Sequence, residues 1–230
     1  MGCPGEYGWS TVGGLTPVPD AVITIHQLTG WLRRYYDLVI KNQAELTQLD
    51  SAIGDADHGT NMARGMTAVI NKLEQDRPAH ANELFKTVAM TLVTSVGGAS
   101  GPLYGTFFLR FASAAGPATE LDAEALDMAL RAGLTGIVER GKAAVGDETM
   151  VDALSPALDA MEAVIKNGGD LAGAVQAARD AAAAGRDATV PLVARKGRAS
   201  YLAERSAGHM DPGAFSMTLL FDALAAEIPT

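Results

Sequence analysis

Hydrophobic residues recur every three or four positions along most of the chain, a spacing that is typical of amphipathic helices. No stretch shows the strict alternation, or the β-branched runs with hairpin turns, that a sheet needs. The pattern predicts eight helices, over residues 20–46, 60–75, 81–94, from 102 onward, 121–140, 146–166, 170–188 and 212–226. The seventh is rich in alanine, whose small side chain allows close helix contact. Because the loops are short, we expect an all-α fold, most simply an antiparallel up-and-down bundle.

Glycine and proline mark the expected ends of these helices. Residues 1–19 are rich in both and carry no periodicity, so we expect a flexible tail or linker outside one domain that spans residues 20–230. Pro102 suits the first turn of a helix. Gly141 stands where a C-cap glycine belongs, and Pro156 is expected to kink its helix or to mark the true first turn.

Composition narrows the possible functions. The chain has 230 residues, 48% of them hydrophobic and 20% charged, so it can bury a core and wholesale disorder is not expected. A net charge of −9 and a pI of about 4.9 make nucleic acid and anionic membranes poor partners. The single cysteine excludes an internal disulfide and a multi-cysteine zinc site. We therefore expect a cytoplasmic protein that binds neither nucleic acid nor a membrane.

The most unusual stretch is a cluster of acidic residues, Asp50, Asp55 and Asp57, followed directly by a histidine. Acidic side chains repel one another, so crowding them costs free energy unless a cation lies among them. On a continuous helix Asp55 would point away from the other two. Gly54 and Gly59 instead favour a loop that turns all three carboxylates inward. The cluster therefore predicts a site for a hard metal ion.

The residue types favour Mg²⁺ over other cations. An EF-hand loop begins in a similar way, but Thr60 occupies its required glycine position and Met66 stands where its bidentate glutamate belongs. Zinc prefers nitrogen or sulfur ligands, whereas Mg²⁺ suits carboxylates together with phosphate oxygens. The alternative is that the aspartates are solvated or cap the following helix, which Thr60 or Asn61 could also cap.

A second stretch, residues 95–105, contains four glycines, at positions 97, 98, 101 and 105. Without side chains, its backbone N–H groups can approach an anion closely, and the helix that begins near Pro102 adds a positive dipole end. The stretch matches neither a Walker A nor a G-x-G-x-x-G motif. A flexible hinge or close helix packing would explain the glycines equally well.

Two further stretches carry polar or charged groups next to expected helix starts. Residues 140–150 could form a pocket with an adaptable apolar floor at Met150, although a C-cap, a turn and an N-cap would also account for them. Residues 195–198 place three cations close together in an acidic chain, and arginine binds phosphate through bidentate hydrogen bonds. A solvated basic loop is the alternative. The Asp-Pro-Gly at 211–213 is typical of a turn before the last helix.

Together, the acidic, glycine-rich and basic loops would form a phosphate–metal site in an all-helical protein. Four runs also carry a family resemblance: GDADHGTNM (54–62), SVGGASGPLYGTFF (95–108), RGKA-x-x-GD-x-TM (140–150) and ARKGRASYL-x-ERS-x-GH-x-DPGA (194–214). With these motifs in order, nearly all of residues 21–228 resembles the nucleotide-binding subunit of dihydroxyacetone kinase.

The resemblance implies an eight-helix antiparallel barrel whose loops at one end build the nucleotide site. In that family the D-x4-D-x-D pattern, here Asp50, Asp55 and Asp57, holds two Mg²⁺ ions. The residues implied to contact ADP or ATP are His58, Gly59, Thr60, Asn61, Ala99, Ser100, Gly141, Met150, Arg198, Asp211, Pro212 and Gly213. No catalytic side chain is implied, because catalysis would consist of positioning and charge neutralisation.

The resemblance also implies partners. In the family a second subunit holds dihydroxyacetone covalently on a histidine, and this dihydroxyacetone receives the γ-phosphoryl group. In one branch the nucleotide domain is fused behind the substrate domain and uses exchangeable ATP. In the other it is a separate chain, here expected to be a homodimer, whose ADP is rephosphorylated in place by a phosphotransferase-system protein. A chain of 230 residues resembles the second branch. The alternatives are a related kinase for a four-carbon sugar or a fatty acid, and a non-catalytic nucleotide-sensing module.

Overall fold

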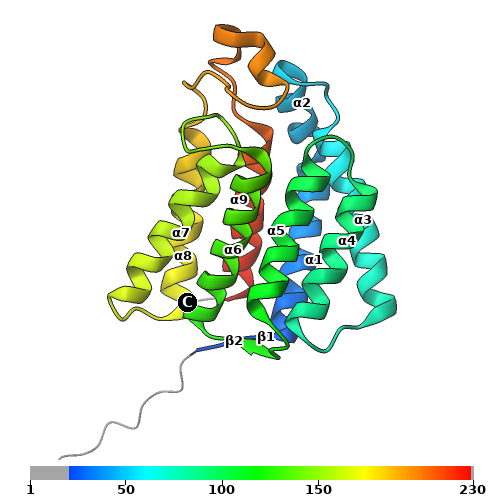
Figure 1. Ribbon diagram of the computed structural model, residues 1–230, viewed down its shortest axis with the longest axis vertical. Helices are drawn as coiled ribbons and strands as arrows, with labels where there is room; N and C mark the ends of the chain where they lie inside the picture. The colour runs from blue at the N-terminus through cyan, green and yellow to red at the C-terminus, as the bar shows by residue number, and fades with distance from the viewer. Residues whose placement is uncertain (1–20, 229–230) are drawn as a thin grey trace, which may run out of the picture.

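Eight long helices form a closed up-and-down ring in the computed structural model, which describes residues 21–228 (Figure 1). They are α1 (Ile25–Lys41), α3 (His58–Asp76), α4 (Ala81–Ser95), α5 (Ser100–Ala115), α6 (Ala123–Gly141), α7 (Met150–Lys166), α8 (Leu171–Asp187) and α9 (Pro212–Glu227). Each packs against the next, and α9 closes the ring against α1. A shorter helix, α2 (Gln43–Ile53), and a 3₁₀-helix, η1 (Ala199–Ser206), lie at one end. The all-α prediction is confirmed, while the tail expected over residues 1–19 lies outside the described range.

The start of α1 differs from the prediction. The expected first residue, Asp20, lies outside the described part of the chain, and the N-cap is Thr24. Its hydroxyl accepts a hydrogen bond from the Gln27 N–H (3.3 Å), and the Gln27 side chain accepts one from the Thr24 N–H (3.0 Å). Just there, β1 (Ile23–Thr24) pairs antiparallel with β2 (Glu120–Leu121). The expectation of no strand is therefore wrong for these two short segments.

The expected first helix is also broken in two. Asn42 ends α1, because its side chain donates a hydrogen bond to the Leu38 carbonyl (2.7 Å), as its own backbone N–H does (3.0 Å). The chain restarts as α2, buries Leu46 and continues to Ile53. Asp50 thus lies in the last turn of a helix, which corrects the prediction that all three aspartates lie in a loop.

Three more helix ends differ from the prediction, and one of them is the start of α7, which lies at Met150 instead of residue 146. Helix α3 begins at His58, so Thr60 and Asn61 are helical residues and do not cap it. Helix α6 ends with Gly141 itself, and Lys142 takes the left-handed conformation (φ 52°) that was expected of the glycine. The residues that cap α3 and α6 are therefore Asp57 and Lys142, which lie within four positions of the predicted caps.

The contact between α7 and α8 is as close as the alanine-rich sequence predicted. Pro156 lies well inside α7, so it does not mark the first turn, and it leaves the Asp152 carbonyl without a partner in the helix. Gly185 of α8 packs on that carbonyl, and a Cβ there would overlap it. Small residues therefore bring the two backbones together.

Buried aromatic side chains fill the ring. The rings of Phe85 and Phe111 have centroids 4.1 Å apart, and Trp31 lies 5.7 Å from Phe85. The Trp31 indole also donates a hydrogen bond to the Leu220 carbonyl (2.8 Å), which ties α1 to α9. Each such side chain contributes about 1.5–3 kcal/mol by burial, so the loops start from well-fixed helix ends. Within residues 21–228, no helix is both long and apolar enough to cross a membrane.

Candidate functional site

The connections at one end of the ring surround a cavity of about 370 Å³. Its walls come from the end of α2 with residues 54–57, from the loop before α5, from residues 142–149, and from residues 196–199 with the start of α9. Figure 1 shows these segments gathered at the end that carries α2. The four stretches that the sequence singled out thus meet at one place.

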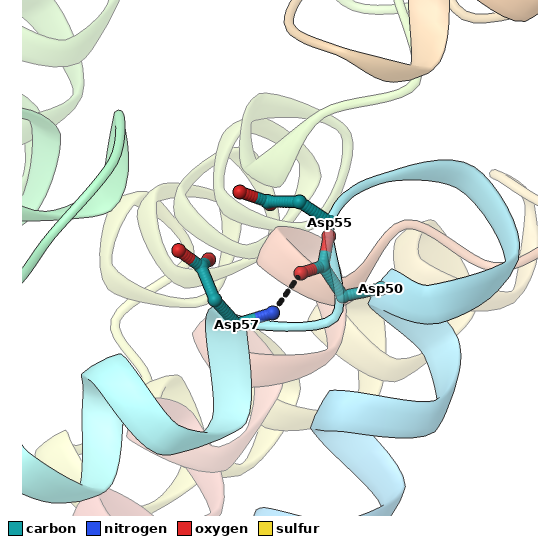
Figure 2. Close-up of side chains that lie close together, drawn as sticks. All are labelled: Asp50, Asp55 and Asp57. Carbon is teal, nitrogen blue, oxygen red and sulfur yellow. Dashed lines mark hydrogen bonds between the residues drawn. The ribbon is translucent and has the colours of Figure 1, made fainter.

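Three carboxylates from a short segment lie close together at this cavity (Figure 2). Asp50 lies in the last turn of α2, Asp55 follows in the loop, and Asp57 is the N-cap of α3. One oxygen from each lies within 4.8 Å of the others. Three carboxylate oxygens at this spacing fit a hard cation such as Mg²⁺ rather than Zn²⁺.

Asp50 also holds the start of α3 in place. Its Oδ2 accepts hydrogen bonds from the N–H groups of Asp57 (2.7 Å) and His58 (3.0 Å). These are N–H groups that have no partner within the helix, so Asp50 caps α3 from outside it. Gly54 leaves room for this carboxylate, because a Cβ there would overlap Oδ1.

An arginine lies on the same cluster. The Arg198 guanidinium forms an ion pair with the Asp55 carboxylate, and both side chains are partly exposed. Exposed ion pairs contribute only about 0–1 kcal/mol. Arg198 can therefore exchange Asp55 for a phosphate group at low cost, and its planar fork suits that ligand.

His58 links the acidic cluster to the glycine-rich loop and to α9. Its Nδ1 lies 3.0 Å from the Ser100 hydroxyl and its Nε2 lies 2.9 Å from the Ser216 hydroxyl. Burial lowers the pKa of His58 to about 4, against the opposing effect of Asp50 and Asp57. The ring is therefore neutral at pH 7, with one donor and one acceptor nitrogen. Such a ring can position neighbouring groups but brings no positive charge.

The glycine-rich loop brings the start of α5 to the cavity wall. Gly98 has a φ of +63°, and a Cβ on Gly101 would overlap the Val96 carbonyl, so both positions need glycine. Ala99, the N-cap, has no side chain that could bond the first N–H groups of the helix. These groups and the positive dipole end are thus available to an anion. This geometry favours an anion site over a simple hinge.

Another part of the wall is apolar. It is lined by Ile53, Leu103, Ile137, Ala143, Met150 and Val151. Gly141 lies beside these residues on the wall, where a Cβ would only just contact the Leu103 side chain, at 3.4 Å. An apolar slot with an adaptable methionine suits a flat ring such as a nucleobase.

The start of α9 completes the cavity. Asp211 caps this helix, and its Oδ2 accepts a hydrogen bond from the Ala214 N–H (2.6 Å). Burial raises the pKa of the Asp211 carboxyl to about 7, which that hydrogen bond only partly offsets, and the nearby Glu148 carboxylate adds to the rise. Pro212 and Gly213 follow along the wall.

Comparison with known proteins assigns the chain to a family. The family model of the DAK2 domain matches residues 52–226. The chain belongs to the Dak2 family.

Relatives of this Dak2 chain include two kinase subunits. The chain is 44% identical over 194 residues to "PEP-dependent dihydroxyacetone kinase 1, ADP-binding subunit DhaL" of Listeria innocua, covering 84% of this chain and 92% of that one. It is 43% identical over 199 residues to "PEP-dependent dihydroxyacetone kinase, ADP-binding subunit DhaL" of Escherichia coli K12, covering 86% and 95%.

A solved structure shares the fold. The dihydroxyacetone kinase from C. freundii in complex with AMP-PNP and Mg²⁺ superposes with a TM-score of 0.67 at 26% identity. The match covers 98% of this Dak2 chain and 38% of that protein.

The cavity gathers most of the predicted site residues of this Dak2 domain. Those that line it are Asp50, Asp55, Asp57, His58, Ala99, Ser100, Gly141, Met150, Arg198, Asp211, Pro212 and Gly213. Their contacts with metal and nucleotide stay predictions.

Three predicted residues lie beside the cavity rather than on its wall. Thr60 is exposed on α3, and a Cβ on Gly59 would overlap the Gln43 carbonyl, so this glycine lets α3 pack on α2. Asn61 is buried and accepts a hydrogen bond from Arg64 (2.7 Å). A nucleotide contact by these three residues also stays a prediction.

Glu148 lies in the stretch 140–150 but is not one of the predicted site residues. This residue lines the cavity, its backbone has a left-handed φ of 60°, and it is only 2% exposed. Neither carboxylate oxygen has a hydrogen-bond partner, and burial raises the pKa of the carboxyl to about 7. A glutamate in a Gly-Asp-Glu-Thr turn is normally solvated, so only the fold places it in the site.

Proposed function

We propose that this Dak2 chain is the nucleotide-carrying subunit of a dihydroxyacetone kinase. It transfers the γ-phosphoryl group of Mg-bound ATP to dihydroxyacetone held on a partner subunit. A phosphotransferase-system protein then rephosphorylates the ADP in place. The names of the relatives, at 43–44% identity over nearly their whole length, support this choice among kinases of the family.

One observation carries the proposal: the acidic cluster and the uncapped start of α5 lie on the same cavity. Carboxylates alone would repel a polyphosphate, and the α5 N-terminus alone could hold any anion. A Mg²⁺–nucleotide complex satisfies both, because its cation suits the carboxylates and its phosphates suit the N–H groups. The apolar slot beside them suits the base.

Asp50, Asp55 and Asp57 would hold the two expected Mg²⁺ ions. Bound there, the ions would neutralise charge on the phosphates during transfer. The other groups of the site position the nucleotide: the N–H groups of α5 and Arg198 bind phosphate oxygens. Neutral His58 keeps Ser100 oriented through its 3.0 Å contact. Catalysis by this chain is thus a matter of preorganised charge and position.

The test combines the purified chain with a dihydroxyacetone-binding subunit and a phosphotransferase-system phosphoryl donor. We expect dihydroxyacetone phosphate to form only when all three proteins and Mg²⁺ are present, with ADP needed in no more than stoichiometric amounts. Asp55→Asn is expected to abolish turnover. Glu124→Gln is the matched control, since Glu124 is exposed in the first turn of α6, at the opposite end of the ring.

Other outcomes would redirect the assignment. Turnover with a partner that holds a four-carbon sugar, but not with dihydroxyacetone, would select a related kinase. Nucleotide binding without transfer to any kinase partner would select a sensing module. The expected homodimer is tested separately by light scattering, where a monomer mass at working concentration would contradict it.

A further inference from the structure

Glu148 is a buried carboxylate without a partner in the protein. Its side chain is 2% exposed, and neither oxygen accepts a hydrogen bond. None of the ion pairs formed within residues 21–228 includes it. Burying an unpaired charge is costly, and the left-handed backbone at this residue (φ 60°) adds strain. A side chain held in this way inside a cavity points to a ligand that supplies the missing donors.

The groups around Glu148 are already engaged. The Asp152 oxygens accept hydrogen bonds from the N–H groups of Gly146 (2.5 Å) and Thr149 (2.8 Å). The Ser206 hydroxyl donates to the Ala203 carbonyl (2.9 Å). The Asp152 carboxylate has no proton to donate and repels Glu148, while the Ser206 hydroxyl lies near enough to lower the pKa of Glu148 but is directed at the Ala203 carbonyl. At most one protein hydroxyl can therefore reach this carboxylate, and a molecule that fills the cavity can supply the remaining donors.

The position of Glu148 limits which part of a nucleotide can reach it. The charge of Glu148 acts on Asp211, on which Asp50 of the acidic cluster also acts. Met150 of the apolar slot follows two residues later in the chain. Glu148 thus shares the cavity wall with both the acidic cluster and the apolar slot. Phosphates carry the wrong charge to approach it, and the slot takes the base, so the sugar lies against it.

We propose that the Glu148 carboxylate binds the ribose of the nucleotide, accepting hydrogen bonds from the 2′- and 3′-hydroxyls. The two free oxygens of one carboxylate can accept hydrogen bonds from two neighbouring hydroxyl groups. A 2′-deoxyribose lacks one of these two hydroxyls. Glu148 is then a specificity-determining residue that selects ribonucleotides. This inference rests on the proposed function, because it takes the cavity to be a nucleotide site.

The test measures binding of Mg·ADP, Mg·2′-deoxy-ADP and Mg·IDP by calorimetry to the full chain, from which nucleotide and Mg²⁺ bound during purification have first been removed. A hydrogen bond to a charged group corresponds to about a tenfold change in Kd. We expect the wild type to prefer ADP over 2′-deoxy-ADP about tenfold. Glu148→Ala is expected to bind ADP and 2′-deoxy-ADP with about equal affinity, because its affinity for ADP falls. Glu124→Ala removes the same side chain far from the site and is expected to keep the wild-type preference.

Several results would overturn the inference. The first is an equal affinity of the wild type for ADP and 2′-deoxy-ADP. The second is a Glu148→Ala variant that still prefers ADP over 2′-deoxy-ADP. The third is a Glu148→Ala variant that no longer discriminates between ADP and IDP, which would show that Glu148 contacts the base. Failure of the wild type to bind any Mg-nucleotide would instead refute the proposed function, and the inference with it.

A folding control keeps the test decisive. Removing an unpaired buried charge is expected to raise the Tm of the ligand-free protein, so Glu148→Ala is expected to fold. If it does not fold, Glu148→Gln replaces it in the test. Because its side chain has one acceptor oxygen instead of two, this variant is expected to prefer ADP over 2′-deoxy-ADP less strongly than the wild type does. A wild-type preference in Glu148→Gln would then contradict the inference.

Discussion

Asp50→Ala is expected to destabilise the protein even without metal or nucleotide, because Asp50 caps α3 from a neighbouring helix. Its Oδ2 accepts hydrogen bonds from the N–H groups of Asp57 and His58, at 2.7 and 3.0 Å. Loss of a capping acceptor costs about 0.5–2 kcal/mol, and a buried N–H left unpaired costs about 1–3 kcal/mol. Relief of repulsion within the acidic cluster offsets part of this. The net loss is about 2 kcal/mol, or about 4–8 °C in Tm for a domain of this size.

The assay is urea unfolding of the ligand-free protein in the presence of EDTA, comparing midpoints at constant slope. Asp55→Ala is the matched control, since Asp55 belongs to the same cluster but forms only the partly exposed pair with Arg198. Its change is expected to stay within about 1 kcal/mol. Asp50→Asn retains one oxygen acceptor and is expected to fall between the two. Equal losses in Asp50→Ala and Asp55→Ala, or no loss in Asp50→Ala, would refute the capping role.

Three further predictions concern the same end of the ring. Gly54→Ala forces the Asp50 carboxylate to move and is expected to weaken Mg·ADP binding at least tenfold, as measured by calorimetry; unchanged affinity would show that this carboxylate is free to shift. Glu148 has a folded-state pKa of about 7 against its usual 4.5, so the folded state holds the proton more tightly and the unfolding free energy falls as pH rises from about 4.5 to 7. Glu148→Gln removes this pH dependence. In urea titrations, the unfolding free energy of the variant is expected to be higher than that of the wild type by about 1–3 kcal/mol at pH 8, and by less at pH 5. Arg198→Ala is expected to weaken Mg·ADP binding about tenfold while leaving the ligand-free Tm within about 2 °C; a large Tm loss would instead make Arg198 structural.

The helices could be predicted from the sequence because their apolar spacing persists for four turns or more. The break at Asn42 could not, because it depends on one side-chain hydrogen bond to Leu38 and leaves the spacing of leucines intact. The missed strands are only two residues long each and exist because two distant segments meet at the far end of the ring. Local patterns carry no information on such contacts.

The candidate site, like the fold, could be predicted from the sequence only in part. The acidic cluster could be found from the sequence because three aspartates close together are costly without a cation. Its geometry could not, since Asp50 reaches the others from a helix and uses one oxygen to cap α3. Glu148 was missed because its burial is set by the fold around residues 142–149 and by the neighbouring segment that carries Ser206.

Native mass spectrometry of the protein purified without added nucleotide tests the central claim most directly. We predict a mass that corresponds to the chain with bound ADP and Mg²⁺, which gains one phosphoryl group after incubation with the phosphotransferase-system donor and loses it when a dihydroxyacetone-loaded partner is added. A mass of the chain alone, unchanged after incubation with excess Mg·ADP, would contradict the assignment of this cavity as a nucleotide site.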